Sequence, residues 1–443
     1  MERKNSSKTK YFVFILFYMA TFFIALSSLT SSGNKHSESH TSNIILIILF
    51  IPILTRYLIN VFISPLSDAL AKFSEKKFKR ISYTPKVSVV IPAWNEDVGI
   101  ISTIASVLGN SYENFEIIIV NDGSTDSTDS VIRDYLVKNP EINNIRYVNK
   151  ENGGKASALN SGVKKASGDL IITIDADSVM DKNAIASFVK YFKDPRVMAA
   201  AGNVRIGNSG TLIGSIQHLE YIYGFYFKKA DSLMNSIYIV GGAAAAYRKQ
   251  VFEFFGYFDT DTITEDIEMS TRIQSQGQKI VYAKDAIIYT EGASDLRSLI
   301  KQRLRWKRGR FETFYKYRRL FFSTSAEHNK ILSWFILPLA FFAEILLFFE
   351  AFLLVFLYTN AIYYHNFSQL LLSIIILSMV ITMQIITEDK KIRKYRYIIY
   401  APIGWLIFYI VDFIEYNALL RSIWSIIRKK KVEWQKWQRV GLN

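Results

Sequence analysis

The feature that most limits the fold of this chain is the distribution of its apolar residues. They make up 50% of the 443 residues and concentrate in long runs at the two ends. The runs cover residues 11–29, 43–64, 332–358, 370–386 and 397–420. A run of about 20 apolar residues can cross a bilayer as a helix. Between the runs, residues 86–319 have the mixture of a globular domain, so the sequence predicts membrane spans around a central folded domain.

The basic residues indicate which side of the membrane the central domain occupies. The net charge is +15, and most basic runs flank the apolar segments. The stretches before residue 11 and after residue 64 are basic, whereas the connector 31–42 carries a single Lys35. By the positive-inside rule, we expect a multi-pass protein of the cell membrane with a cytoplasmic central domain that contacts membrane lipids. No nucleic-acid motif accompanies the charge, so nucleic acid is not an expected partner.

The last apolar run leaves two topologies open. A single crossing by residues 397–420 would place the basic tail, residues 428–431, outside the cell. It would also place Asp412 and Glu415 in lipid, unless they face protein or a polar path. A hairpin broken at residues 402–404, or an interfacial helix, would keep the tail inside, and this is the favoured prediction.

The central region alternates short β-branched runs with helix-compatible stretches. The expected strands are residues 87–91, 116–120 and 170–174, and the helices between them include residues 99–108 and 127–137. This alternation predicts an α/β domain with a parallel sheet covered on both faces. Each strand ends in polar or acidic residues, at the edge where such sheets bind ligands.

The residue types restrict the chemistry. The chain has no cysteine, and its 5 histidines show no metal-ligand spacing. A metal would therefore depend on carboxylates, which favours Mg²⁺ or Mn²⁺. Asp175 and Asp177 follow an expected strand and could share such a cation with substrate phosphates, although taken alone they are more typical of a solvated turn after a strand.

Two loops carry further candidates. Asp122, after the second strand, could accept hydrogen bonds from a nucleoside, or could lie in a turn that caps the next helix at Ser124 or Thr125. Lys155 follows two glycines, so its loop could approach a phosphate or serve only as a connection.

Two later segments also have two interpretations each. Asp266 could be a general base, or Thr264 could cap a helix in a capping box with acidic residues in the first turn. Arg305 and Trp306 could bind a diphosphate and stack under a sugar ring. The same basic stretch could be an amphipathic helix on the membrane surface.

Taken together, the order and spacing of these motifs are specific. They read Pro92-Ala93-Trp94-Asn95-Glu96, Asn121-Asp122-Gly123-Ser124, Gly154-Lys155-Ala156-Ser157-Ala158-Leu159-Asn160, Asp175-Ala176-Asp177, Thr264-Glu265-Asp266 and Gln302-Arg303-Leu304-Arg305-Trp306. Over residues 87–310 the chain resembles the family 2 inverting glycosyltransferases, specifically the processive membrane synthases. Within that family it is most similar to bacterial poly-N-acetylglucosamine synthases of biofilms, through residues 202–206, 216–221 and 263–267.

Two stretches depart from the family pattern. Lys307 and Arg308 stand where a small or polar pair usually precedes the glycine, and residues 241–246 form an unusually plain Gly-Ala run. Both stretches lie near the expected acceptor.

The resemblance implies a GT-A fold, a Rossmann-like α/β catalytic domain, between transmembrane helices. It implies transfer of N-acetylglucosamine with inversion from UDP-N-acetylglucosamine to a growing β-1,6-linked polysaccharide, coupled to translocation across the membrane. A small accessory membrane subunit is compatible with the resemblance. Hyaluronan, chitin or cellulose synthesis, or glycosylation of a lipid, stay open as alternatives. An inactive scaffold or a transport channel with the same fold is the alternative outside enzymes.

The resemblance also assigns roles to residues. Asp266 is the implied catalytic base, and Arg305 is implied to steady the departing UDP. The implied nucleotide-binding residues are Ala93, Glu96, Asp122, Lys155, Asp175 and Arg305. The implied acceptor-binding residues are Gly241, Gly242, Gln302, Arg303 and Trp306. Asp177, with Asp175, is the implied ligand of the divalent cation.

The expected organisation has four parts. Residues 1–70 form two N-terminal membrane helices, and residues 71–295 form the cytoplasmic GT-A domain. Residues 296–331 form a basic amphipathic segment with the Gln302–Trp306 motif, and residues 332–443 form the C-terminal membrane region and basic tail.

Overall fold

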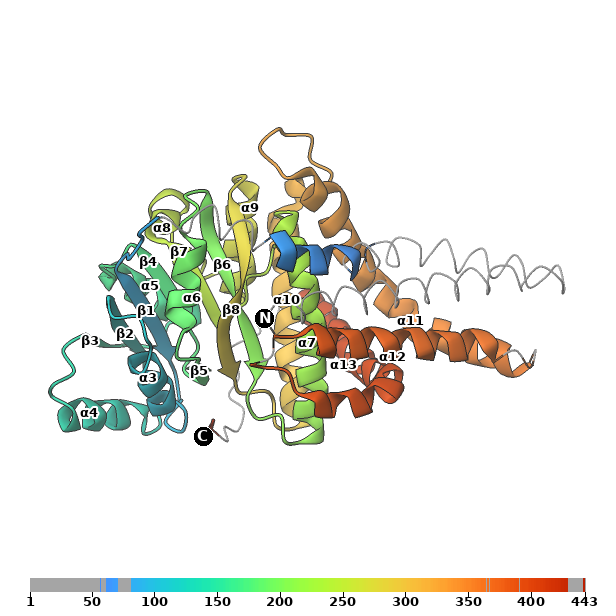
Figure 1. The fold of residues 1–443 in the computed structure, drawn as a ribbon, viewed down its shortest axis with the longest axis horizontal. Helices are drawn as coiled ribbons and strands as arrows, with labels where there is room; N and C mark the ends of the chain where they lie inside the picture. The colour runs from blue at the N-terminus through green and yellow to red at the C-terminus, as the bar shows by residue number, and fades with distance from the viewer. Residues whose placement is uncertain are drawn as a thin grey trace, which may run out of the picture. The chain divides into compact units, whose positions relative to one another are not determined.

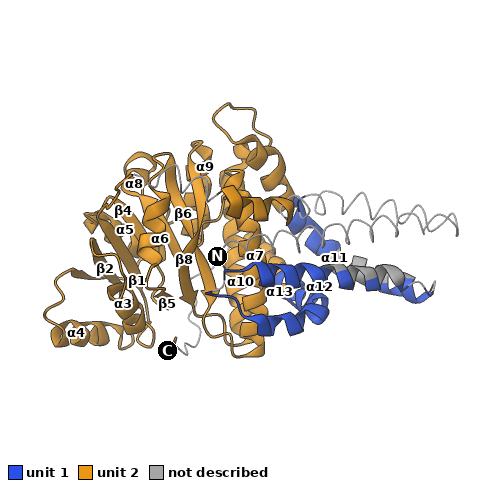
Figure 2. Cartoon of the chain, in the orientation of Figure 1, with its two compact units in different colours: residues 1–59, 342–416 blue, residues 60–341, 417–443 orange. Residues whose placement is uncertain are grey.

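A computed structural model describes residues 56, 61–70, 81–363, 365, 367–389, 391–428 and 441–442. The chain divides into two compact units, residues 1–59 with 342–416 and residues 60–341 with 417–443 (Figure 2). The predicted span 11–29 and most of the predicted span 43–64 lie outside the described residues. All candidate site residues belong to the second unit.

An eight-stranded mixed sheet forms the centre of the second unit, in the order β3-β2-β1-β4-β7-β6-β8-β5 (Figure 1). The strands are β1 (Val87–Ala93), β2 (Phe115–Asp122), β3 (Ile145–Lys150), β4 (Leu170–Ile174), β5 (Ser178–Met180), β6 (Val197–Ile206), β7 (Ala244–Arg248) and β8 (Lys279–Thr290). β1 pairs in parallel with β2 and β4, and β2 pairs in parallel with β3. The three predicted strands are therefore β1, β2 and β4.

The prediction of an all-parallel sheet is correct for one half only. β7 runs antiparallel to both β4 and β6, and β5 runs antiparallel to β8. β6 and β8 are parallel, with a register shift between Gly202 and Asn203. Antiparallel β7 brings its N-terminal end, at Ala244, beside Ile174 at the carboxyl end of β4.

Helices cover both faces of the sheet, as Figure 1 shows. The helices of the second unit are α3 (Ile100–Leu108), α4 (Thr128–Lys138), α5 (Lys155–Lys165), α6 (Ala184–Tyr191), α7 (Leu212–Leu233), α8 (Lys249–Phe255), α9 (Glu265–Ser275) and α10 (Leu296–Lys316), followed by the short 3₁₀-helix η2 (Arg318–Leu320). A further helix covers Val61–Leu70. Apolar residues of α3, α4 and α6 enter one core cluster, and those of α5, α8 and α9 enter the other. All of β4 is buried, because its alternate residues enter the two clusters.

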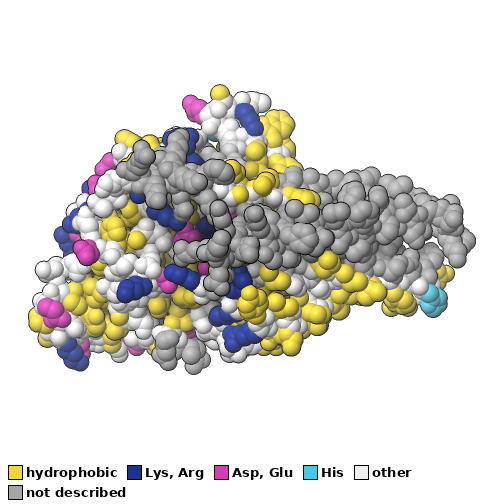
Figure 3. Space-filling model, in the orientation of Figure 1, with side chains coloured by type: hydrophobic (Ala, Val, Ile, Leu, Met, Phe, Trp, Pro, Cys, Tyr) yellow, Lys and Arg dark blue, Asp and Glu magenta, His cyan; other side chains and the backbone are white. Residues whose placement is uncertain are grey.

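The C-terminal part is helical. A π-helix η3 (Leu332–Ile336) leads into α11 (Leu337–Tyr363), and α12 (Ser368–Thr387), η4 (Tyr395–Ile403) and α13 (Gly404–Ile427) follow. Among the residues that the structure describes, two stretches are long and apolar enough to cross a membrane, Leu332–Phe349 and Tyr395–Ile427, and Leu377–Thr387 of α12 is a shorter apolar stretch. Pro402 lies in η4, so the break predicted at residues 402–404 falls where η4 ends and α13 begins, and α13 itself is continuous. Hydrophobic side chains gather on the surface over α12 and α13 (Figure 3).

Candidate active site

The acidic pair lies at the carboxyl edge of the central strands. Asp175 follows β4 directly, and Asp177 precedes β5. Asp177 Oδ1 accepts hydrogen bonds from the Ser178 hydroxyl at 3.1 Å and the Thr290 hydroxyl at 3.4 Å. Asp175 is less buried, with 28% of its side chain exposed, and binds Lys155. The pair therefore has one carboxylate held by hydroxyls and one that is partly exposed and paired with Lys155.

Lys155 joins the acidic pair to the start of α9. Its ammonium Nζ lies 2.5 Å from Asp175 Oδ1 and 3.2 Å from Glu265 Oε1. Burial alone would lower the pKa of Lys155, but Asp175, Glu265 and Asp266 together raise it well above its usual value. Lys155 is therefore a permanent cation among three carboxylates.

Burial and two neighbouring carboxylates act together on Asp175. Burial raises the pKa of Asp175, Lys155 opposes this, and the carboxylates of Asp177 and Glu265 raise it further. The result is a pKa above the usual value despite the short ion pair with Lys155. An additional cation at this position would reduce the repulsion.

The Asp122 carboxylate holds the loop that ends at Lys155. Its fully buried carboxylate accepts from Lys150 Nζ at 2.5 Å and from the backbone N–H of Gly154 at 2.7 Å. The N–H of Gly153 donates to the same carboxylate at 3.1 and 3.2 Å. Gly154 adopts φ +86°, a conformation that favours glycine, just before α5 begins at Lys155. The Asp122 carboxylate therefore accepts its hydrogen bonds from protein donors, and Lys150, one of these donors, was not singled out from the sequence.

The end of β1 lies beside this loop. Ala93 is buried and pairs in register with Asn121. Asn95, at φ 56°, accepts the backbone N–H of Thr125 at 2.8 Å through Oδ1. Glu96 is buried and its backbone N–H donates to the Thr128 hydroxyl at 2.8 Å. These contacts join the ends of β1 and β2, where the nucleotide was expected.

The candidate base is at the first turn of α9. The backbone N–H of Ile267 donates to Asp266 Oδ1 at 2.9 Å, which leaves Oδ2 directed elsewhere. A Cβ placed on Gly242 would lie 2.8 Å from Lys155 Nζ and 3.4 Å from Asp266 Oδ2. Gly242, in the segment before β7, therefore approaches both groups closely, and Gly241 precedes it at φ +94°.

Thr264 does not cap α9 in the predicted way. Its backbone is in the N-cap position, but its side chain makes no capping hydrogen bond. The hydroxyl is buried and finds no hydrogen-bond partner among the described residues. The reason is packing: a Cβ on Gly309 of α10 would lie 2.0 Å from Thr264 Oγ1. The capping-box interpretation is wrong, because this side chain faces α10.

The Gln302–Trp306 motif lies in the first half of α10. Arg303 donates to both carboxylate oxygens of Glu220 in α7 at 2.6 Å, and its guanidinium carbon lies 4.4 Å from the centroid of the Trp306 ring. Gln302 and Arg303 are buried, whereas Arg305 and Trp306 are partly exposed. Arg303 thus ties α10 to α7 and supports the Trp306 ring, and its partner Glu220 was not singled out from the sequence.

The C-terminal residues also reach this edge of the sheet. The backbone N–H of Gly441 donates to Glu291 Oε2 at 3.1 Å. Glu291 in turn donates its own backbone N–H to the carbonyl of Asp177 at 3.3 Å.

Comparison with known proteins identifies this arrangement. A family model described as glycosyltransferase like family 2 matches residues 85–309, which include every site residue described above except Gly441. This chain belongs to glycosyltransferase family 2. It is therefore a glycosyltransferase, and an inverting mechanism is consistent with this family.

Two curated relatives of this family 2 enzyme have the same name. Poly-beta-1,6-N-acetyl-D-glucosamine synthase of Staphylococcus aureus strain COL is 38% identical over 242 residues, which cover 54% of this chain and 57% of the relative. The enzyme of that name from Staphylococcus epidermidis is 36% identical over 234 residues, 52% of this chain and 56% of the relative. The match thus spans little more than half the length of these relatives.

A solved structure supports the fold of the family 2 domain. The mannosyltransferase PcManGT from Pyrobaculum calidifontis, in complex with GDP-Man and Mn²⁺, has a TM-score of 0.53 and 18% sequence identity. The likeness covers 85% of this chain and 100% of that chain. At this identity it shows the fold alone, a GT-A-like mixed sheet.

The residues present fit a divalent cation at the acidic pair. The described part of the chain has no group of three or more His, Cys, Asp or Glu residues suited to a metal. Mg²⁺ in phosphate chemistry typically uses one or two carboxylates plus substrate phosphates, so two carboxylates suffice. Burial, and then the carboxylates of Asp177 and Glu265, raise the pKa of Asp175, and a cation between the carboxylates would offset their repulsion.

Proposed function

We propose that this family 2 enzyme is a processive membrane synthase that transfers N-acetylglucosamine from UDP-N-acetylglucosamine to a growing poly-β-1,6-N-acetylglucosamine chain and couples growth to translocation. The observation that carries the proposal is the assembly of Lys155, Asp175, Glu265 and Asp266 beside Gly242. It combines a cation, an acidic pair and a candidate base at one sheet edge. The 38% identity to a synthase of that name supports the sugar and the linkage.

The proposed chemistry is a single displacement. The acceptor hydroxyl gives its proton to Asp266 while its oxygen bonds to C1 of the donor sugar. The bond between C1 and the diphosphate oxygen breaks, and its electron pair leaves with the diphosphate. Arg305 places positive charge near the leaving group, and Trp306 provides a partly exposed ring for the acceptor sugar. A divalent cation held by Asp177 and Asp175 would offset the charge on the diphosphate.

We propose that the loop before α5 contributes to donor binding. Asp122 holds the N–H groups of Gly153 and Gly154 and so fixes where Lys155 begins α5. Ala93 and Glu96 lie in and after the neighbouring strand β1 and complete the proposed nucleotide site. Lys155 then serves the diphosphate side, through its contacts with Asp175 and Glu265.

The direct test is turnover by the purified protein with individual nucleotide sugars. We expect UDP release with UDP-N-acetylglucosamine, and a product that a β-1,6-N-acetylglucosaminidase degrades and chitinase does not. Incorporation of glucose or glucuronic acid, or digestion by chitinase, would instead support the cellulose, hyaluronan or chitin alternatives. Absence of turnover with every donor would favour the scaffold or channel alternative.

The assignment of the base has its own test. Asp266→Asn should keep donor affinity and lower transfer by about 100- to 10,000-fold, because the amide cannot accept the proton. Asp261→Asn is the matched control, since Asp261 is an exposed aspartate in the preceding loop. Retention of more than a tenth of wild-type turnover by Asp266→Asn, with the control unaffected, would refute the role.

The proposed location is the cell membrane, with several spans and a cytoplasmic catalytic domain. The apolar stretches Leu332–Phe349 and Tyr395–Ile427 support membrane insertion. The chain has no native cysteine, so a single introduced thiol reports the side of the membrane. Glu113→Cys places that thiol at an exposed position of the catalytic domain. An impermeant thiol reagent should label it only after cell lysis, and labelling of intact cells would contradict a cytoplasmic domain.

A further inference from the structure

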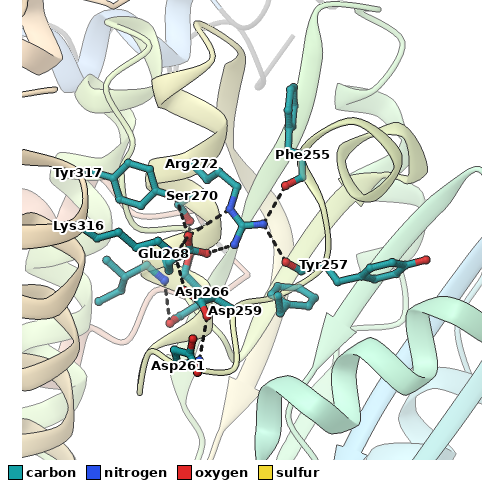
Figure 4. Close-up of polar contacts among 12 residues, drawn as sticks. Phe255, Tyr257, Asp259, Asp261, Asp266, Glu268, Ser270, Arg272, Lys316 and Tyr317 are labelled. Carbon is teal, nitrogen blue, oxygen red and sulfur yellow. Dashed lines mark hydrogen bonds and ion pairs between the residues drawn. The ribbon is translucent and has the colours of Figure 1, made fainter. Parts of the chain in front are cut away.

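A buried carboxylate lies one turn beyond Thr264 on α9. Glu268 has no exposed surface, and its two oxygens accept from three side chains (Figure 4). Arg272 donates through Nε at 3.1 Å and through a second nitrogen. From the end of α10, Lys316 Nζ lies at 2.9 Å and the hydroxyl of Tyr317, the residue after that helix, lies at 2.6 Å.

The same donors reach the loop that precedes α9. Lys316 also binds the carboxylate of Asp259, and Arg272 Nη1 donates to the carbonyls of Phe255 at 3.0 Å and Tyr257 at 2.8 Å. Figure 4 shows these side chains converging between α9, α10 and the loop. We call Asp259, Glu268, Arg272, Lys316 and Tyr317 the Glu268 cluster. It joins the end of α8, the loop before the base, α9 and the end of α10.

The charges of the Glu268 cluster are balanced, with two carboxylates and two cations. Burial would lower the pKa of Lys316, but its hydrogen bonds to Asp259 and Glu268 raise it above the usual value. Burial raises the pKa of the Tyr317 hydroxyl, and the hydrogen bond to Glu268 raises it further. Both groups therefore remain protonated donors at neutral pH, and Glu268 keeps its partners.

A second contact fixes α9 against α10 one turn earlier. Thr264 and Glu268 are four residues apart, so they share one face of α9, and that face meets α10. Thr264 packs on Gly309, while Glu268 binds Lys316, seven residues further along α10. The two contacts lie two turns apart on α10, and together they fix the rotation of α9 about its axis and its position along α10. They thereby fix Asp266, whose Oδ2 faces Gly242 on another side of α9.

We propose that the Glu268 cluster is a positioning element for glycosyl transfer, which holds the base-bearing turn of α9 in register with the acceptor-binding helix α10. The inference rests on the proposed role of Asp266. The acceptor hydroxyl must lie within hydrogen-bond reach of that carboxylate while its sugar rests on α10. A displacement of about 1 Å between two such groups costs about 100-fold in rate. The cluster is therefore expected to act on the transfer step, while Asp175 continues to hold Lys155 for donor binding.

The test uses substitutions at the edge of the cluster, because Glu268→Gln could prevent folding. Lys316→Met removes one donor to Glu268, and Tyr317→Phe removes only a hydroxyl. Lys316→Arg keeps the charge, and Tyr315→Phe is the matched control, since Tyr315 is 73% exposed on the same helix. The full-length enzyme is assayed for kcat, KM for the donor, donor affinity and melting temperature.

We expect Lys316→Met to lower kcat about 10- to 100-fold, by the displacement argument, with donor KM and donor affinity unchanged. Tyr317→Phe should show a smaller loss of the same kind, Lys316→Arg should recover most of kcat, and Tyr315→Phe should match the wild type. If the variants lose kcat only in proportion to their loss in melting temperature, and regain it when assayed at a lower temperature, the proposal is overturned. Donor KM rising in proportion, or wild-type kcat in Lys316→Met, would also overturn it.

Failure of the proposed function gives a different result. If the wild type uses another nucleotide sugar, the product assignment is wrong, and the cluster is tested with that donor. If Asp266→Asn stays active while Lys316→Met does not, the base assignment fails and the positioning proposal falls with it.

Discussion

The close packing of Gly309 against Thr264 gives a prediction that can be worked out in numbers. A methyl group on Gly309 would place its carbon 2.4 Å from Thr264 Cγ2 and 2.6 Å from Thr264 Cβ. Carbon atoms in contact normally lie about 3.5–4.0 Å apart. Thr264 is branched at Cβ and immediately precedes α9, so rotating the side chain cannot remove both contacts. The Gly309→Ala variant must therefore move the start of α9 by about 1 Å from α10.

Two effects on stability oppose each other in Gly309→Ala. Alanine inside a helix is favoured over glycine by roughly 0.5–1 kcal/mol. An extra methyl group in a well-packed contact costs about 1–3 kcal/mol. The net effect is a destabilisation of roughly 0.5–2 kcal/mol, so the fold should survive. The effect on catalysis is larger, because a 1 Å displacement of the base lowers kcat about 100-fold.

The matched control is Gly224→Ala in α7. Gly224 is an exposed helical glycine, and a Cβ there meets no atom of the described residues within 4 Å. This variant should gain the roughly 0.5–1 kcal/mol of helix propensity and keep full activity. Release of nucleoside diphosphate from the donor and thermal unfolding in detergent measure both effects. If Gly309→Ala is stabilised as Gly224→Ala is, or keeps more than half of wild-type kcat, the contact does not position Asp266.

Three further outcomes are expected. Burial lowers the pKa of Lys228 to about 8 from 10.5, so its charged form is less stable in the folded protein, and Lys228→Met should raise the melting temperature at pH 7. Between pH 8 and 10.5 the unfolded wild-type chain binds more protons than the folded one, so the free energy of unfolding should increase as the pH rises through this range. Lys228→Met should not show this increase. Excess chelator should abolish turnover by the wild-type enzyme, and added Mg²⁺ or Mn²⁺ should restore it. Asp177→Asn should show no metal-stimulated turnover. Full wild-type activity in excess chelator would exclude a role for the cation. Arg303→Lys and Glu220→Gln should each lower the melting temperature. The double variant should lose less than the sum of the two single losses, because both substitutions break the same bidentate ion pair. Additive losses would show that the two residues act independently.

The sheet was predictable where its strands are β-branched and buried on both faces. The runs 87–91, 116–120 and 170–174 became β1, β2 and β4, because each contributes alternate residues to two core clusters. β7 gave no such signal, since its residues at the sheet centre are mainly alanine. Its antiparallel direction follows from tertiary pairing with β4 and β6, which no local pattern encodes.

The sequence indicated which strand and helix ends carry the candidate residues, but not which contacts these residues make. The strand-end rule places Asp122 and Asp175 at one sheet edge, and the structure agrees. The rule could not reveal that Asp122 is occupied by Lys150 and by two backbone N–H groups, because the first pairing depends on the register of β2 and β3. Likewise, a Thr followed by acidic residues predicts a capped helix, but the Thr264 side chain instead packs against Gly309 of α10, where no side chain stands in its way.

The two departures from the family pattern have physical explanations in the structure. Arg308 binds Glu312 one turn along α10 and donates to the Ser425 hydroxyl at 3.0 Å, so this larger side chain is directed into contacts of its own. The plain Gly-Ala run, residues 241–246, ends in β7, where Ala244 and Ala246 are buried between β4 and β6. There, a Cβ on Gly202 of β6 would already lie 3.0 Å from the Ala244 Cβ, so larger side chains would not fit. Ala244 thus fits the close packing of β6 and β7, and the lack of a side chain at Gly242 lets the backbone approach Lys155 and the proposed base.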